Sequence, residues 1–167
     1  MKTTEINNIV EHLEMLPHPE GGFFKEVYRS EGIIPKEGLQ DFSGDRNFCT
    51  SIYFLLTSDN FSAFHRIKQY EIWHFYKGSP LYVHVIDKEG RYTRHEVGLE
   101  LEQGQVPQLT VPRGCWFASS VKNENDFSFV GCTVAPGFDF EDFELADRLD
   151  LITNYPSHSE IIKQLTR

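Results

Sequence analysis

The segment HRIKQYEIWHFYKG, residues 65–78, brings two histidines, one glutamate and four aromatic side chains into one short stretch. Apolar and polar residues alternate in its second half with the two-residue period of a β-strand, in which successive side chains point to opposite faces. One face is then expected to carry Glu71, Trp73 and Phe75, and the other Ile72, His74 and Tyr76. We therefore expect a site that contains His65 and Glu71, with His74 directed away from Glu71.

The rest of the chain consists mainly of short β-rich runs separated by turn sequences such as Ser58-Asp59-Asn60 and Lys77-Gly78-Ser79-Pro80. Residues of these types favour turns because they adopt or fix turn dihedral angles. About nine strands are expected, at 23–29, 47–57, 61–67, 71–76, 81–86, 91–97, 106–111, 115–121 and 127–134. Because no helical segment separates these runs, they predict an all-β antiparallel barrel or jelly roll.

Helical patterns are found only near the two ends of the chain. Apolar residues recur at helical spacing over 4–16, and the acidic segment 139–150 has room for one short helix. Ser157 and Glu160 have the spacing of a capping box in front of Ile161. The polar stretch 30–46 is expected to be a plain connection or a lid over a pocket. We expect one domain spanning residues 1–167.

The formal net charge of −9 disfavours a nucleic acid partner, because phosphates repel an acidic surface that has no basic stripe. The longest strongly apolar run, 52–56, is far too short to cross a bilayer, and the first residues lack the apolar centre of a signal peptide. The three cysteines include no CxxC pair, which favours reduced, buried thiols. We expect a cytoplasmic protein without a membrane partner.

The spacing His65-x-Ile67-x3-Glu71-x6-Gly78 resembles the first motif of the cupins, and Gly104 with Pro112-Arg-Gly-x2-Phe117 resembles the second. Four further signatures are similar to those of one cupin family, formerly catalogued as a domain of unknown function (DUF985). They are His18-Pro-Glu-Gly-Gly, Glu71-Ile-Trp-His, Val111-Pro-Arg-Gly-Cys-Trp and Ala135-Pro-Gly-Phe-Asp. The resemblance implies a double-stranded β-helix, the cupin jelly-roll barrel, with short terminal helices. It also implies a homodimer and a shape like that of germins and dTDP-sugar 3,5-epimerases.

The chain departs from the cupin pattern at two of the four positions that usually bind a metal. His65 and Glu71 are kept, but the other two positions hold Ile67 and Phe117, which have no donor atom. We therefore expect no resident metal cofactor. A weakly bound divalent metal is the alternative, and it would need replacement ligands such as His84 or Gln108.

Similarity to the metal-free epimerases implies proton transfer, with His65 as base and Glu71 as the partner that orients it. Candidate acids are Tyr53, Tyr70, Tyr76 and Tyr82. The substrate-binding wall is expected to include Tyr53, Trp73, Phe75, His84, Gln108, Trp116 and Phe117. Aromatic faces would stack on a sugar or nucleotide-sugar.

Several alternatives remain open from the sequence. One is a non-catalytic sensor or carrier of a small ligand, another is a metal-dependent enzyme, and in a third the pair of His65 and Glu71 is purely structural. His18-Pro-Glu-Gly-Gly is expected to form a tight turn, or to close the mouth of the barrel. Candidates to hold an anionic group are Arg29, Arg46 and Arg66, because a guanidinium binds phosphate through two hydrogen bonds.

Overall fold

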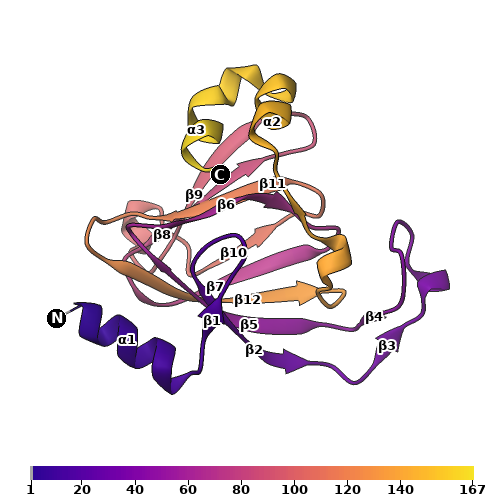
Figure 1. Ribbon diagram of the computed structural model, residues 1–167, viewed down its shortest axis with the longest axis horizontal. Coiled ribbons are helices and arrows are strands. Elements are labelled where there is room, and N and C mark those ends of the chain that lie inside the picture. The colour runs from indigo at the N-terminus through magenta and orange to yellow at the C-terminus, as the bar shows by residue number, and fades with distance from the viewer. Residues whose placement is uncertain (1) are drawn as a thin grey trace.

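The computed structural model describes residues 2–167, which form two antiparallel sheets that face each other (Figure 1). The larger sheet has the order β1 (Leu16–Pro17), β2 (Phe23–Arg29), β5 (Thr50–Thr57), β12 (Phe127–Ala135), β7 (Tyr70–Gly78) and β10 (Gln108–Val111). The smaller sheet has the order β13 (Glu144–Leu145), β6 (Phe61–Arg66), β11 (Trp116–Val121), β8 (Leu81–Ile86) and β9 (Tyr92–Val97). The expected all-β jelly-roll barrel is confirmed.

Three short helices lie near the chain ends. They are α1 (Lys2–His12), α2 (Arg148–Asn154) and α3 (Ser159–Gln164), and single 3₁₀ turns occur at Lys36–Gly38, Leu101–Gln103, Phe140–Asp142 and Pro156–His158. Figure 1 shows α2 and α3 outside the smaller sheet and α1 at the opposite side of the molecule. Across residues 2–167 no helix has the length and apolar character needed to span a bilayer.

The interior of the barrel is filled by large side chains from both sheets. Phe54, Trp73 and Phe117 are almost completely buried and belong to one apolar cluster between the sheets. A second cluster, which includes Trp116 and Ile162, lies where the C-terminal helices cover the outer face of the smaller sheet. Because side chains alternate between faces, neighbouring residues such as Trp116 and Phe117 enter different clusters.

The strands agree with the expectations from sequence more closely than the helices do. The nine expected strands are present, and those at 23–29 and 81–86 have the expected bounds. The first helix ends at His12 rather than at 16, because the chain then turns into β1. The capping-box prediction is wrong: α3 begins at Ser159, Ser157 lies in the preceding 3₁₀ turn, and no side chain caps the helix.

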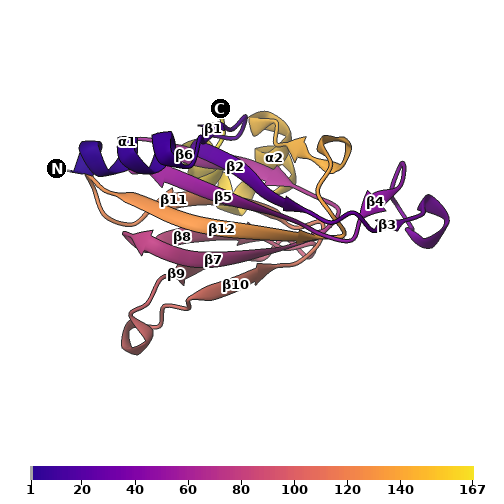
Figure 2. The same ribbon diagram turned by 90° about the horizontal axis from the view of Figure 1, so that it is seen from below.

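The segment expected as a connection or lid, 30–46, contributes most of a two-stranded arm. Its strands β3 (Ile33–Ile34) and β4 (Arg46–Asn47) pair with each other, and Figures 1 and 2 both show the arm extending away from the barrel. Arg46 fixes the base of the arm, since its Nε and Nη2 donate to the Asp142 carboxylate at 2.7 and 2.9 Å. Gln69 Nε2 donates to the same carboxylate at 2.6 Å.

Candidate functional site

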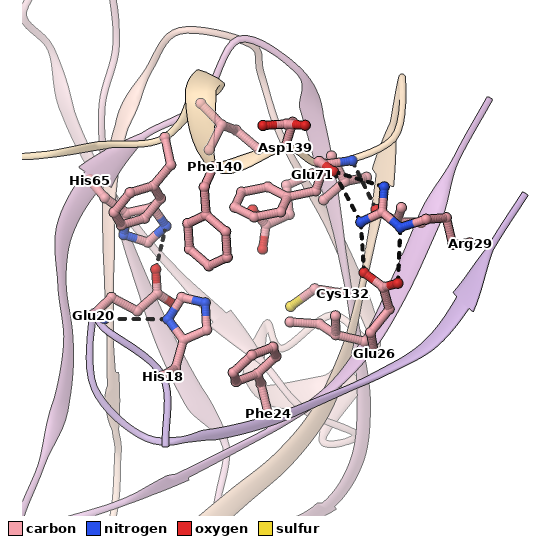
Figure 3. Close-up of a pocket in the computed structure, with 16 residues that line it drawn as sticks. His18, Glu20, Phe24, Glu26, Arg29, His65, Glu71, Cys132, Asp139 and Phe140 are labelled. Carbon is pink, nitrogen blue, oxygen red and sulfur yellow. Dashed lines mark hydrogen bonds and ion pairs between the residues drawn. The ribbon is translucent and has the colours of Figure 1, made fainter. Parts of the chain in front are cut away.

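A pocket of about 270 Å³ opens at one end of the barrel (Figure 3). Its wall combines strands of both sheets with the turn before β2 and the loop that follows β12. The polar side chains of the wall are His18, Glu20, Glu26, Arg29, Thr50, His65, Glu71 and Asp139. Concave sites with a few converging polar groups on an apolar background are the usual form of small-molecule sites.

His65 is paired with Glu20, which reaches it from the turn between β1 and β2. The distance from His65 Nε2 to Glu20 Oε2 is 2.9 Å, and both side chains are more than nine-tenths buried. The turn packs against β6 through a hydrogen bond from Ala63 N–H to the Glu20 carbonyl oxygen at 2.9 Å. Gly21 permits this approach, because its φ is +115° and a Cβ there would lie 2.1 Å from the Phe61 carbonyl oxygen.

The hydrogen bonds of His65 favour its charged form. Nδ1 donates to the Ala63 carbonyl oxygen at 2.7 Å, and Nε2 faces the Glu20 carboxylate, so each ring nitrogen meets an acceptor. Burial opposes the charge, but the Glu20 carboxylate outweighs it and raises the pKa of His65. Burial likewise opposes ionisation of Glu20, and His65 outweighs it, so that the pKa of Glu20 is lowered. The pair is therefore a buried imidazolium carboxylate ion pair.

Glu71, at the start of β7, has the opposite environment. Burial raises the pKa of Glu71 to about 7, and the charge of His65 only partly offsets this effect. None of the ion pairs found within residues 2–167 includes Glu71. The buried thiol of Cys132 on β12 lies beside it, and burial next to Glu71 raises the pKa of that thiol. Glu71 is thus a pocket carboxyl group that exchanges its proton near neutral pH.

His18 supplies a neutral imidazole. Its Nδ1 accepts a hydrogen bond from the Glu20 N–H at 3.3 Å, which places the ring proton on Nε2. Burial lowers the pKa of His18, although Glu20 acts in the opposite direction. The ring packs edge-on against Phe24 with 4.8 Å between centroids, and Figure 3 shows its second nitrogen facing the open part of the pocket.

A β-bulge in β2 places Arg29 in the pocket. Glu26 pairs with Ile52 and Tyr28 with Ser51, so Val27 is an extra residue and the alternation of side chains shifts by one. Arg29 then lies on the same face as Glu26, and its Nε and Nη2 donate to the Glu26 carboxylate at 2.9 and 2.7 Å. Figure 3 shows this paired contact at the edge of the pocket.

Phenylalanines of the loop after β12 form the apolar rim. Phe138 and Phe140 meet edge to face with 5.0 Å between ring centroids, and Phe143 lies 6.1 Å from Phe140. Phe143 also lies 5.3 Å from the ring of His65. Phe140 is 54% exposed, so its ring forms part of the mouth of the pocket rather than of the core.

The structure brings together the two residues expected to be catalytic, His65 and Glu71, but it changes their relationship. The residue hydrogen-bonded to His65 is Glu20, not Glu71. The tyrosines considered as acids, Tyr53, Tyr70, Tyr76 and Tyr82, do not line this pocket. Sequence reasoning assigned no chemistry to His18 and Glu20, because only the packing of their turn against β6 brings them to the site.

The residues expected to form the substrate wall lie elsewhere. Trp73, Phe75 and Phe117 face the barrel interior, where they belong to or border the apolar cluster between the sheets. Trp116 faces the C-terminal helices, and Tyr53 packs near α1. Gln108 is exposed, and His84 bonds Tyr92 Oη and Ser120 Oγ on the outer side of the smaller sheet. Strand alternation explains the outward-facing members of this set.

The donor atoms at the cupin metal positions do not fit a metal with four protein ligands. Ile67 lines the pocket, and the Phe117 ring packs 4.1 Å from the His65 ring, between centroids. Both nitrogens of His65 already have protein partners. No cluster of three or more His, Cys, Asp or Glu side chains suited to a metal ion occurs in residues 2–167. His84 and Gln108, the replacement ligands considered from sequence, are outside the pocket.

Comparison with known proteins agrees with the fold and the motifs. The family model described as "Cupin superfamily (DUF985)" matches residues 7–146. The chain is 32% identical over 149 residues to the protein YML079W of Saccharomyces cerevisiae, covering 83% of this chain and 74% of the relative.

Two solved structures are also similar over almost the whole chain. Protein SO0799 from Shewanella oneidensis has a TM-score of 0.86 and 40% identity, covering 96% of each chain. A hypothetical protein from Leishmania major has a TM-score of 0.84 and 38% identity, covering 96% of this chain and 97% of its own. This chain therefore belongs to the DUF985 family of the cupin superfamily.

Proposed function

We propose that the pocket binds a small polar molecule and moves a proton on it without a metal, as an epimerase or isomerase does. The observation that carries this proposal is the position of Glu71. It is a buried carboxyl group in the pocket wall with no ion-pair partner within residues 2–167, and its pKa is about 7. A group that gains and loses its proton near neutral pH is suited to general acid–base chemistry.

This proposal gives the residues of the pocket different roles from those expected from the sequence. Ionised Glu71 removes a proton from a carbon next to a carbonyl group, and the electron pair of the broken C–H bond moves onto the carbonyl oxygen. The N–H at His18 Nε2 faces the open part of the pocket and donates to that oxygen. Return of a proton from solvent to the opposite face of the same carbon completes an epimerisation. Transfer of the proton from Glu71 to the former carbonyl carbon completes an isomerisation, in which the neighbouring hydroxyl group gives up its proton to become the new carbonyl and the former carbonyl oxygen takes up a proton. The ion pair of His65 and Glu20 holds the turn that carries His18.

Hydrogen exchange with solvent tests this proposal on a panel of candidate substrates. The wild-type chain would be incubated in D₂O with aldoses, ketoses, keto-deoxy sugars and amino sugars, and exchange at carbon followed by proton NMR. We expect exchange on at least one compound and a loss of about 100-fold or more in the Glu71→Gln variant. Glu11→Gln, on the exposed face of α1, is the matched control. Equal exchange by wild type and Glu71→Gln would contradict the proposal.

A non-catalytic carrier or sensor is the second candidate. It is favoured by the protein partners of His65, because an imidazole whose two nitrogens are both bonded is static. In that case a panel compound would stabilise the protein against heat without exchanging hydrogen in D₂O. His65→Gln would then keep the binding, since a neutral amide still offers hydrogen bonds to Glu20.

We also propose that the chain forms a homodimer. Val27 and Tyr28 on the outer face of β2 and Ile33 and Phe48 on the arm are exposed apolar side chains next to a sheet edge. Exposed strand edges and apolar patches of this kind are commonly covered by a partner. Light scattering that gave the mass of one chain at micromolar concentration would contradict this proposal.

A further inference from the structure

Both cationic side chains of the pocket have their donors occupied by the protein. Arg29 donates from Nε and Nη2 to Glu26, from Nη1 to Asn47 Oδ1 at 2.9 Å, and from both terminal nitrogens to the Phe138 carbonyl oxygen. His65 donates to Ala63 and Glu20. An anionic ligand group would therefore find no free charged donor here, which removes the reason to expect Arg29 to bind a phosphate.

The carboxylates of the pocket outnumber its cations. Arg29 neutralises Glu26, and His65 neutralises Glu20. Glu71 and Asp139 remain, and neither has an ion-pair partner within residues 2–167. Asp139 Oδ1 accepts the Glu141 N–H at 2.9 Å, and Arg29 acts on Asp139 only at longer range. The pocket is consequently a region of negative potential whose free hydrogen-bonding groups are mainly acceptors.

The aromatic rim adds to this preference. Phe138, Phe140 and Phe143 form a triangle with ring centroids 5.0 to 6.4 Å apart, and all three line the pocket. Asp139 lies between two of them in the same loop. The face of an aromatic ring attracts a cation, and several rings next to a carboxylate are a recurrent way to bind an ammonium group.

We propose that the ligand of this pocket carries a positively charged nitrogen, held by the rings of Phe138, Phe140 and Phe143 and by the carboxylates of Glu71 and Asp139. This inference rests on the proposed function in one respect, namely that the same pocket binds the substrate. It narrows the expected substrate from sugars in general to amine-bearing compounds such as amino sugars, and it disfavours nucleotide-sugars.

A pair of probes with the same shape isolates the charge. Choline and its neutral carbon analogue 3,3-dimethylbutan-1-ol differ in whether the quaternary centre is nitrogen or carbon, and binding of each to the full chain would be measured by calorimetry. We expect choline to bind about tenfold more tightly than the neutral alcohol. Glu71→Gln and Asp139→Asn should each weaken the binding of choline by a larger factor than the binding of the alcohol, whereas Glu11→Gln should change neither.

Three outcomes would overturn the inference. They are equal binding of choline and the alcohol, binding of neither, and tighter binding of an anion such as glycerol 3-phosphate. The proposed function is tested by a different measurement, the exchange of substrate hydrogen in D₂O, so the two proposals can fail independently. Neutral ketoses that exchange with Glu71 dependence, combined with no preference for choline, would leave the function in place and remove the cationic ligand.

Discussion

The carboxylate of Glu20 lies 2.9 Å from His65 Nε2, in a buried contact between a turn of the larger sheet and a strand of the smaller one. This contact gives the histidine of the first cupin motif a partner from outside that motif. It also leaves Glu71, the other retained motif residue, without an ion pair in the part of the chain that the structure describes. The two glutamates therefore have different protonation behaviour in one pocket.

Glu20→Gln should destabilise the protein by about 3 kcal/mol near pH 6, because it leaves the charge of His65 buried without a partner. Folding lowers the pKa of Glu20, so its contribution to stability decreases as pH falls below about 4.5 and is lost once pH passes below the pKa of Glu20 in the folded protein. That of His65, whose pKa is raised, is lost as pH rises above about 6.5 and through its folded pKa. Urea unfolding at several pH values should show the largest difference from wild type between these limits. A pH-independent difference would contradict the ion pair.

Glu71→Gln should have the opposite effect on stability. Folding raises the pKa of Glu71 to about 7, so the wild-type protein loses stability as pH rises from about 4.5 to about 7, where only the unfolded chain has released this proton. The variant lacks this loss and should be more stable by about 3 kcal/mol at pH 8, with little difference near pH 4.5. Chemical denaturation of the wild type and the variant at the two pH values measures the difference in stability at each. A variant less stable than wild type at pH 8 would show that ionised Glu71 has a stabilising partner.

Arg46→Ala should lower the free energy of unfolding by about 3 kcal/mol or more, because the guanidinium and the Asp142 carboxylate are both nearly inaccessible to solvent. The matched control is Arg91→Ala, which removes a pair with Asp87 in which the arginine side chain is 75% exposed. That change should leave the free energy of unfolding close to that of the wild type, because solvent screens an exposed pair. Thermal unfolding of both variants tests the comparison. Amide hydrogen exchange in the arm should also become faster in Arg46→Ala but not in Arg91→Ala. Similar effects of the two substitutions would contradict the conclusion that the buried pair of Arg46 and Asp142 fixes the arm.

Gly78→Ala tests the last residue of the first cupin motif. Gly78 has a φ of +98°, and a Cβ there would lie 2.1 Å from the Phe127 carbonyl oxygen, so we expect a loss of at least about 2 kcal/mol. The control is Gly38→Ala, where the nearest atom to an added Cβ is 3.6 Å away and the change should be within about 0.5 kcal/mol. Urea denaturation of both variants measures the difference. A mild effect at Gly78 would mean that the turn relaxes.

The strands could be predicted from sequence because their alternation and their turns are local properties. The strand at 81–86, for example, lies between two clear turn signals and has the expected bounds. The same alternation correctly separated Glu71 and Trp73, which face inward, from His74, which contacts Thr133. The motif pattern was also sufficient to identify the family.

The site could be predicted only in part, because it depends on which turns meet across the barrel. The turn at 18–22 reaches β6 through tertiary packing, and no spacing along the chain indicates that Glu20 will pair with His65. The expected aromatic wall does not line this pocket, for a related reason. Trp116 and Phe117 must face opposite sides of β11, but the sequence does not indicate which side faces the pocket. The rim formed by Phe138, Phe140 and Phe143 belongs to an irregular loop. Its sequence has no helical or strand periodicity from which the directions of these side chains could be predicted.

The bulge at Val27 makes the wall of the pocket tolerant to a change in chain length at one position. Deleting Val27 would give β2 a regular alternation and still leave Phe24, Glu26 and Arg29 on the inner face, since Val27 is the residue without a partner in β5. Deleting Lys25 would turn either Phe24 or Glu26 to the outside. Among relatives that differ in length here, a gap at the bulge is compatible with an unchanged pocket, whereas a gap two residues earlier marks a pocket with a different lining.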